Sequence, residues 1–221
     1  MTRIARVIVP DYPHHIVQRG NRRQDVFFQD DDYHHYLELV SYWCKEEGVA
    51  IWSYCLMPNH VHLIVTPQME SNLSRAIGET HRRYTQRINF RENWRGYLWQ
   101  GRYSSFPMGE NHWLEAAAYV ELHPVKAGMV QMPWDYRWSS VHAYLSGKSD
   151  GIVTLDPLQS QVKDWAAFLK NRMDDTHTAF EVHARTGRPM GNARFIKQIS
   201  DRLGRDLLPK KPGPKPKHEQ R

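Results

Sequence analysis

The sequence has little cysteine and no long apolar run, and both absences exclude classes of protein. Only Cys44 and Cys55 occur in 221 residues, too few for a disulfide framework or a four-cysteine zinc site, so we expect a reducing, cytoplasmic environment. No apolar stretch approaches the roughly 20 residues that a membrane-spanning helix needs. Residues 1–15 lack an apolar segment followed by a small-residue cleavage site, so the sequence predicts neither a secretory signal nor a membrane association.

The sequence also has fewer acidic than basic residues, above all at its C-terminal end. The net charge is +6, and residues 210–221, with five Lys or Arg and one Glu, supply +4 of it. This Pro- and Gly-containing basic tail is predicted to be disordered, and its Lys210 and Lys211 are candidates for attraction to DNA phosphates. The charge balance favours a polyanionic partner, nucleic acid before membrane.

Apolar periodicity predicts an α+β fold in the first part of the chain. Strands are expected at residues 7–9, 14–19, 49–55, 60–66 and 97–108. Helices are expected at residues 33–47, 71–90 and 113–122, the last with Asn111 as its N-cap and Pro124 as its interruption. The order strand-helix-strand-strand-helix-strand predicts a ferredoxin-like antiparallel sheet with helices packed on one face.

The chain then loses its strand signals, which suggests a helical appendage. A short helix is predicted at residues 141–145, a linker at residues 146–151, and amphipathic helices at residues 161–172 and 192–203. We therefore expect a first domain over residues 1–145, a small helical extension over residues 146–209 and the basic tail over residues 210–221.

The most informative stretch is Met57-Pro58-Asn59-His60-Val61-His62-Leu63, a turn that leads into a strand. Because successive side chains of a strand point to opposite faces, His60 and His62 share one face, while Val61 and Leu63 point into a core. Two imidazoles side by side are suitable metal ligands. The spacing alone leaves open a second interpretation, two histidines on the solvated face of a half-buried strand.

Further ligands must come from another element, and the predicted helix around residue 119 offers Tyr119 and His123. They are four residues apart, so they share a helix face if the helix continues to His123. This pair would place a phenol nucleophile beside a third metal ligand. The alternative is that Tyr119 is one of eleven tyrosines and His123 only a residue at the helix end before Pro124.

Four spaced motifs together resemble a known family. The histidine motif resembles the His-hydrophobe-His (HUH) signature of single-tyrosine transposases, and Tyr119-Val120-Glu121-Leu122-His123-Pro124 resembles their nucleophile helix. Residues 15–24 and Trp138-Ser139-Ser140 fit the same pattern. The match covers about residues 5–145, and it is best with the REP-associated tyrosine transposases, relatives of the transposases of simple insertion sequences.

The resemblance implies a function and a set of site residues. It implies a ferredoxin-like fold that cleaves single-stranded or hairpin DNA and transfers the strand. Tyr119 would form a 5′-phosphotyrosine link, and His60 and His62 would bind a divalent ion, Mg²⁺ or Mn²⁺. His123 stands where members of the family carry Asn or Gln as third ligand, and an all-nitrogen set suits Mn²⁺ better than Mg²⁺. Both a monomer and a homodimer are compatible with the resemblance.

DNA contacts are expected from arginines near the proposed site. Arg22 and Arg23 lie in a polar turn after the second predicted strand, and Arg102 lies in the predicted strand before residue 108. Guanidinium groups bind phosphate oxygens in pairs, so each is a candidate phosphate contact, with an exposed surface arginine as the alternative.

Two other functions are compatible with some of these features. A domesticated DNA-binding protein would recognise hairpins without cutting them, and a metallohydrolase would use the histidine pair without a covalent step. The second is ranked last because no further acidic ligands lie near His62.

Overall fold

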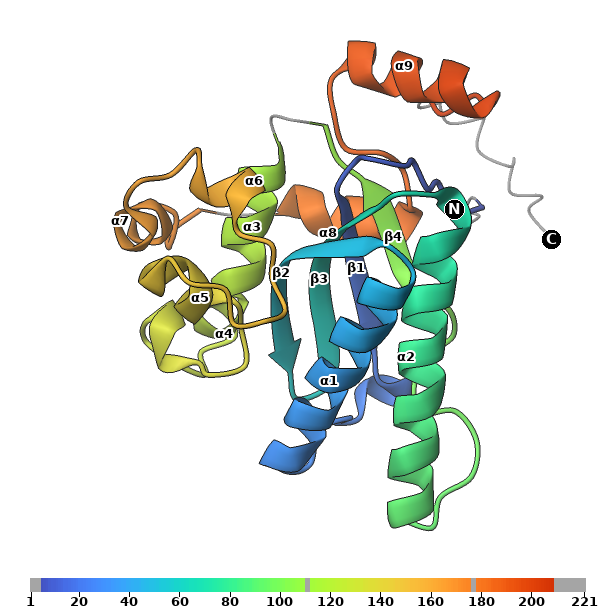
Figure 1. The fold of residues 1–221 in the computed structure, drawn as a ribbon, viewed down its shortest axis with the longest axis vertical. Helices are drawn as coiled ribbons and strands as arrows, with labels where there is room; N and C mark the ends of the chain where they lie inside the picture. The colour runs from blue at the N-terminus through green and yellow to red at the C-terminus, as the bar shows by residue number, and fades with distance from the viewer. Residues whose placement is uncertain (1–4, 110–111, 176–177, 209–221) are drawn as a thin grey trace, which may run out of the picture.

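The computed structural model describes residues 5–109, 112–175 and 178–208, and these contain one four-stranded antiparallel sheet (Figure 1). Asn111, Lys210 and Lys211 lie outside the described residues. The strand order is β2-β3-β1-β4, with bounds His14–Arg19 (β1), Val49–Met57 (β2), His60–Pro67 (β3) and Ser104–Pro107 (β4). Helix α1 (Asp30–Glu46) connects β1 to β2, and α2 (Glu70–Arg91) connects β3 to β4. This connectivity confirms the predicted ferredoxin-like α+β class.

The pairing of β1 with β3 decides which side chains share a face. The two strands are antiparallel, with Val17 opposite His62 and Arg19 opposite His60. Partners in such a pair point to the same side of the sheet, and the intervening residues point to the other. His60 and His62 therefore lie on one face, as predicted, and Leu63 lies on the other.

Helices α1 and α2 cover one face of the sheet and run beside each other (Figure 1). Three aspartates occupy the first turn of α1, where carboxylates complement the helix dipole. One of them, Asp32, is fully buried, accepts from the backbone N–H of Phe28 and forms an ion pair with Arg91 at the end of α2. Gly48 ends α1 in the left-handed conformation, with a φ of 61°.

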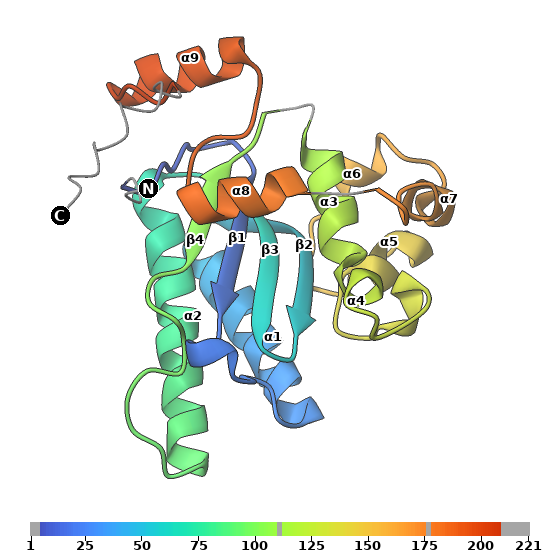
Figure 2. The same cartoon turned by 180° about the vertical axis from the view of Figure 1, so that it is seen from behind.

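The opposite face is covered by elements from later in the chain (Figure 2). Helix α3 (Trp113–Glu121) packs beside β2 and β3, and α4 (His123–Lys126) follows it directly. Helix α8 (Thr178–Thr186) crosses β4 and β1. The face that carries His60 and His62 is thus enclosed, and both side chains are buried.

The later helices join the same hydrophobic core. Trp165 stacks on Tyr144 with ring centroids 4.2 Å apart, and both belong to the core cluster that includes the sheet. Helix α9 (Ala193–Leu203) packs instead against Val7 and Val9 in a second cluster. The remaining elements are α5 (Val141–Ser146), α6 (Asp156–Gln159), α7 (Trp165–Lys170), and the 3-10 turns Asn21–Arg23 and Pro133–Asp135.

Some element predictions were wrong. Residues 7–9 form no strand, because their valines pack against α9 and make no sheet ladder. The strand predicted at residues 97–108 is reduced to Ser104–Pro107, since the chain before it follows the end of β1 irregularly through bonds such as Gln100 N–H to Arg19 O. The helix predicted at residues 161–172 spans Trp165–Lys170, and α6 and α8 were not predicted. Among the described residues, no helix combines the length and apolarity needed to cross a membrane.

A buried histidine beneath α1 gives a prediction on stability. His81 is buried in α2, shares a 3.0 Å hydrogen bond with the Tyr36 hydroxyl, and burial lowers the pKa of His81 to about 3. Between that value and the ordinary pKa of 6.5, only the unfolded chain binds the proton, so stability falls as the pH falls. From pH 7 to pH 5, His81 alone should cost about 2 kcal/mol. Chemical denaturation of wild type and His81→Gln at both pH values checks this, because the variant should lose less stability.

The exposed His142 supplies the matched control. His142→Gln should lose as much stability between pH 7 and pH 5 as the wild type does. Equal losses for wild type and His81→Gln would contradict the assignment of this pH dependence to the buried imidazole.

Candidate active site

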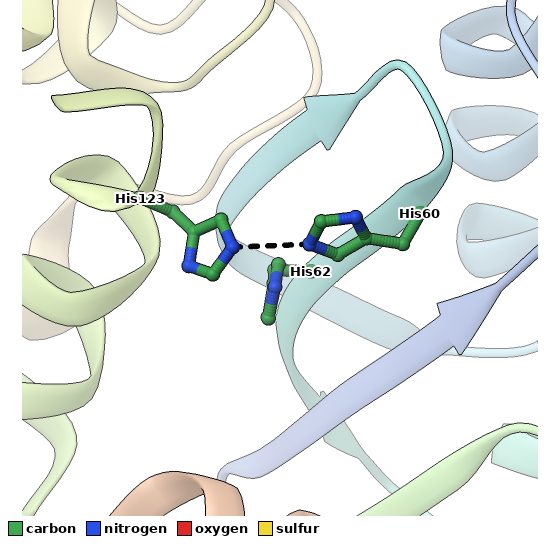
Figure 3. A group of neighbouring side chains, drawn as sticks. All are labelled: His60, His62 and His123. Carbon is green, nitrogen blue, oxygen red and sulfur yellow. Dashed lines mark hydrogen bonds between the residues drawn. The ribbon is translucent and has the colours of Figure 1, made fainter. Parts of the chain in front are cut away.

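Three histidines from two distant segments meet on the enclosed face of the sheet (Figure 3). His60 and His62 project from β3, and His123 is the first residue of α4. One ring nitrogen from each lies within 4.8 Å of the others, and Nε2 of His60 is 3.0 Å from Nε2 of His123. We call these three residues the histidine cluster.

The donor set of the histidine cluster fits a divalent metal ion. Two imidazole lone pairs that meet at 3.0 Å need a proton or a cation between them. Two nitrogens about 2.1 Å from one ion are about 3.0 Å apart at a right angle. Nε2 of His62 is buried without a hydrogen-bond partner among the described residues. A cation would satisfy all three nitrogens at once.

The surroundings favour the protonation state that metal binding needs. Burial lowers the pKa of His60 to about 3 and that of His123 to about 4, and it lowers the pKa of His62 well below its ordinary value. The imidazoles are therefore neutral at pH 7. Nδ1 of His60 lies 2.5 Å from the side-chain oxygen Oδ1 of Asn59, which can only accept, so His60 carries its proton on Nδ1 and presents a lone pair at Nε2.

Tyr119 lies beside the histidine cluster on the last turn of α3. Its ring centroid is 5.5 Å from that of His123 and 5.6 Å from that of His62. Phe180 of α8 stacks on Tyr119 at 5.0 Å, and the side chain of Tyr119 is 8% exposed. Burial, followed by the charge of Glu181, raises the pKa of Tyr119 to about 12, and the charge of Arg19 opposes this rise.

The orientation of Tyr119 and His123 depends on a buried carboxylate between them. Glu121 points away from the histidine cluster into the core, where it accepts from Ser140 Oγ at 2.6 Å and from Trp165 Nε1 at 2.7 Å. These bonds tie α3 to the segments that pack behind it. Leu122, between α3 and α4, keeps helical dihedrals, so Tyr119 and His123 stay on one face although Pro124 follows.

A cavity of about 860 Å³ opens beside Tyr119 and the histidine cluster. The predicted contacts Arg23 and Arg102 line it, whereas Arg22 does not. Arg19 and Arg185 line it too and were not predicted. The complete lining is Val17, Gln18, Arg19, Arg23, His62, Gln100, Arg102, Ser104, Tyr119, His123, Glu181, Ala184 and Arg185.

The two arginines that were missed differ in how they could have been found. Arg19 alternates with Val17 and His15 along a predicted strand, so period-two patterning would have put it on the face of the paired histidines. Arg185 lies on α8, which was not predicted, and nothing in its local sequence connects it with residue 119.

Comparison with known proteins supports one family. A model of the family described as "Transposase IS200 like" matches residues 8–123, which is more than half of the chain. The comparison of this chain with curated protein sequences found no match.

Two solved structures are similar to different degrees. One is described as "Structure of the REP associates tyrosine transposase bound to a REP hairpin"; its TM-score is 0.58 at 18% identity, over 71% of this chain and 93% of that chain. This likeness shows the fold. The second is assigned as a transposase from Deinococcus radiodurans R1, with 21% identity over 54% of this chain and 96% of that one, and its TM-score of 0.39 is too low to support a conclusion.

The family match begins before β1 and ends at His123, so it spans the whole sheet together with Tyr119 and the histidine cluster. On the strength of that match, this chain belongs to the IS200-like transposase family.

Proposed function

We propose that this protein is a metal-dependent endonuclease and strand transferase that acts on single-stranded DNA at hairpin-associated repeats. One observation carries the proposal: Tyr119 from α3 and the histidine cluster from β3 and α4 adjoin one arginine-lined cavity. A nucleophile, a metal-binding group and a phosphate-binding surface are the three components that phosphodiester cleavage of this kind needs.

Tyr119 is the proposed nucleophile. Its Oη would form a bond to the scissile phosphorus while the bond from phosphorus to the 3′-oxygen breaks. The phenol loses its proton, and the leaving 3′-oxygen gains one. The product is a 5′-phosphotyrosine link and a free 3′-OH, and this link conserves the phosphodiester for transfer to another 3′-OH. Because burial raises the pKa of Tyr119 to about 12, the phenol needs nearby positive charge to lose its proton.

The histidine cluster is the proposed metal site, and Mg²⁺ or Mn²⁺ is the expected ion. Such an ion, when bound, neutralises phosphate charge and polarises the P–O bonds. His60, His62 and His123 would hold it through their ring nitrogens. The protein contributes rigidity, because two of these side chains stand on the interior strand β3.

Four arginines in the cavity, Arg19, Arg23, Arg102 and Arg185, are proposed phosphate contacts. Arg19 is the best placed, because it stands opposite His60 across the β1–β3 pair. Its charge lowers the pKa values of Tyr119 and of all three clustered histidines. Arg19 is therefore the proposed cation for the phosphate that Tyr119 attacks.

The hairpin substrate is proposed from the likeness in fold to a transposase described as bound to a REP hairpin. Arg22, which is not among the residues that line the cavity, remains a proposed DNA contact, and so do Lys210 and Lys211 of the basic tail. Both a monomer and a homodimer are compatible with the proposal.

A second candidate function is hairpin binding without cleavage. The stacking of Phe180 on Tyr119 favours it, since the proposed nucleophile is largely covered. Cleavage would require α8 to move or the DNA to approach from the side of the cavity.

Replacement of Tyr119 by Phe tests the nucleophile. A hairpin-bearing single strand from the DNA flanking the gene is labelled at its 3′ end, because a 5′-phosphotyrosine link retains the 3′ portion. Wild type with Mn²⁺ should give a labelled covalent adduct in a denaturing gel, and Tyr119→Phe should give none.

Tyr103 provides the matched control, since it is buried away from the cavity lining. Tyr103→Phe should still form the adduct. An adduct with Tyr119→Phe would refute the proposed nucleophile, and wild-type binding without any adduct would support the non-cleaving alternative.

Replacement of Arg19 by Gln should slow cleavage about 100-fold, the usual effect of removing one group that stabilises transition-state charge. Arg22→Gln, three residues along the chain and outside the cavity lining, should change the rate by less than about threefold, the scale of a surface phosphate contact. Single-turnover cleavage rates measure both. Equal effects of the two substitutions would contradict the special placement of Arg19.

Replacement of His123 by Asn should change the metal preference. Three imidazoles favour Mn²⁺ over Mg²⁺, and an amide oxygen is a better ligand for Mg²⁺. The ratio of the initial cleavage rates in Mn²⁺ and Mg²⁺ should therefore fall in His123→Asn. An unchanged ratio would argue against His123 as a ligand.

A further inference from the structure

His15 of β1 makes a direct contact with the histidine cluster that sequence motifs did not reveal. Its Nε2 lies 3.0 Å from Nδ1 of His62, and the two rings stack with centroids 5.2 Å apart and an angle of 16°. His15 pairs with Ile64 across the β1–β3 ladder, so its side chain shares the face of His62. The contact is a product of the strand register.

Both rings of this contact are almost fully buried. His15 is 1% exposed and His62 is 2% exposed. Phe106 and Tyr119 meet the His15 ring at near-right angles, with centroids 5.3 and 5.7 Å away. The hydrogen bond between the two imidazoles therefore lies in a dry, aromatic environment, where its proton has few alternative positions.

The chemistry of a neutral imidazole allows two arrangements of that proton. Either Nδ1–H of His62 donates to His15, or Nε2–H of His15 donates to His62. In the second arrangement His62 carries its proton on Nε2, the nitrogen that has no hydrogen-bond partner among the described residues. A protonated Nε2 cannot bind a metal ion. Only the first arrangement leaves the lone pair that the histidine cluster needs.

We propose that His15 is a positioning residue that accepts the Nδ1 proton of His62 and thereby holds the Nε2 lone pair toward the histidine cluster. The inference rests on the metal site of the proposed function, but not on cleavage by Tyr119. Asn59 provides the equivalent acceptor for His60, so two ligands of the site are oriented by groups behind them. The acceptor for His62 comes from a neighbouring strand, whereas Asn59 is adjacent in sequence to its ligand.

Two variants separate the hydrogen bond from the packing. His15→Phe keeps an aromatic ring against His62 and Phe106 but removes the acceptor. His15→Gln offers a carbonyl oxygen in place of Nε2. His81→Gln is the control, since it removes a buried histidine under the other face of the sheet.

The first readout is metal affinity without DNA. Titration of each protein with Mn²⁺, followed by the loss of the free-ion electron paramagnetic resonance signal, gives Kd. His15→Phe should raise Kd about 10- to 100-fold, the usual effect of losing such a partner. His15→Gln should lie between His15→Phe and wild type, and His81→Gln should match wild type. An unchanged Kd in a folded His15→Phe would overturn the proposal.

The second readout is the tautomer of His62 in the metal-free protein. Two-bond ¹H–¹⁵N spectra of ¹⁵N-histidine-labelled protein should show wild-type His62 protonated at Nδ1, and a shift toward the Nε2 form in His15→Phe. Wild-type His62 protonated at Nε2 would overturn the proposal even if no variant folds. Failure of wild type to bind Mn²⁺ would overturn the proposal together with the metal site. Absence of a DNA adduct, with the expected affinities and tautomers, would refute only the cleavage reaction and support the role of His15.

Discussion

The register of β1 against β3 is the constraint on which the candidate site depends. Side chains of a strand alternate between faces, so a slip by one residue would turn every one of them to the wrong side. In the observed register Arg19 stands opposite His60 and Val17 opposite His62. His15, two residues earlier on β1, then reaches the second nitrogen of His62. The hydrogen bonds between β1 and β3 thus fix the relative positions of four side chains. These are Arg19, the candidate ligands His60 and His62, and His15, which contacts His62.

The positions of Tyr119 and His123 depend on the buried carboxyl group of Glu121. Glu121 is fully buried, and burial raises the pKa of its carboxyl to about 7, although hydrogen bonds from Ser140, Trp165 and Ser53 oppose the rise. A buried carboxyl without such partners would be strongly destabilising. Here its bonds connect α3 to β2 and to α7, and they orient the helix face that carries Tyr119 and His123. The same side chain that costs desolvation energy therefore fixes the position of two functional candidates.

Helix α8 covers part of the site. Phe180 and Ala184 lie over the sheet face that carries the histidines, and Phe180 stacks directly on Tyr119. Enclosure keeps the imidazoles neutral and the hydrogen bond between His15 and His62 dry. It also raises the pKa of the Tyr119 phenol, so the same burial that keeps the candidate metal ligands neutral makes the proposed nucleophile harder to ionise. The positive charge of the arginine-lined cavity acts against that second effect.

The sequence by itself determined the α+β class, the order of the sheet elements and the shared face of His60 and His62. These follow from local rules, because the apolar period of a helix and the alternation of a strand are properties of neighbouring residues. The family resemblance added Tyr119 and His123 as partners of the histidine pair, which spacing alone left open. Helix α8 escaped prediction and the strand around β4 was predicted too long, since the local patterns there are weak and long-range packing decides where each element begins and ends.

Only the tertiary structure decided what surrounds those residues. It brought Arg19 and His15 beside the paired histidines through the β1–β3 register, and it placed Phe180 over Tyr119 through the path of α8. It also showed that the sheet face of His60 and His62 is buried, whereas the sequence alone was equally compatible with a solvated face. Burial and long-range contacts depend on how distant segments pack, and no pattern within one segment contains that information. The sequence therefore identified the candidate site residues, whereas the tertiary structure determined their protonation states, their contacts and their exposure to water.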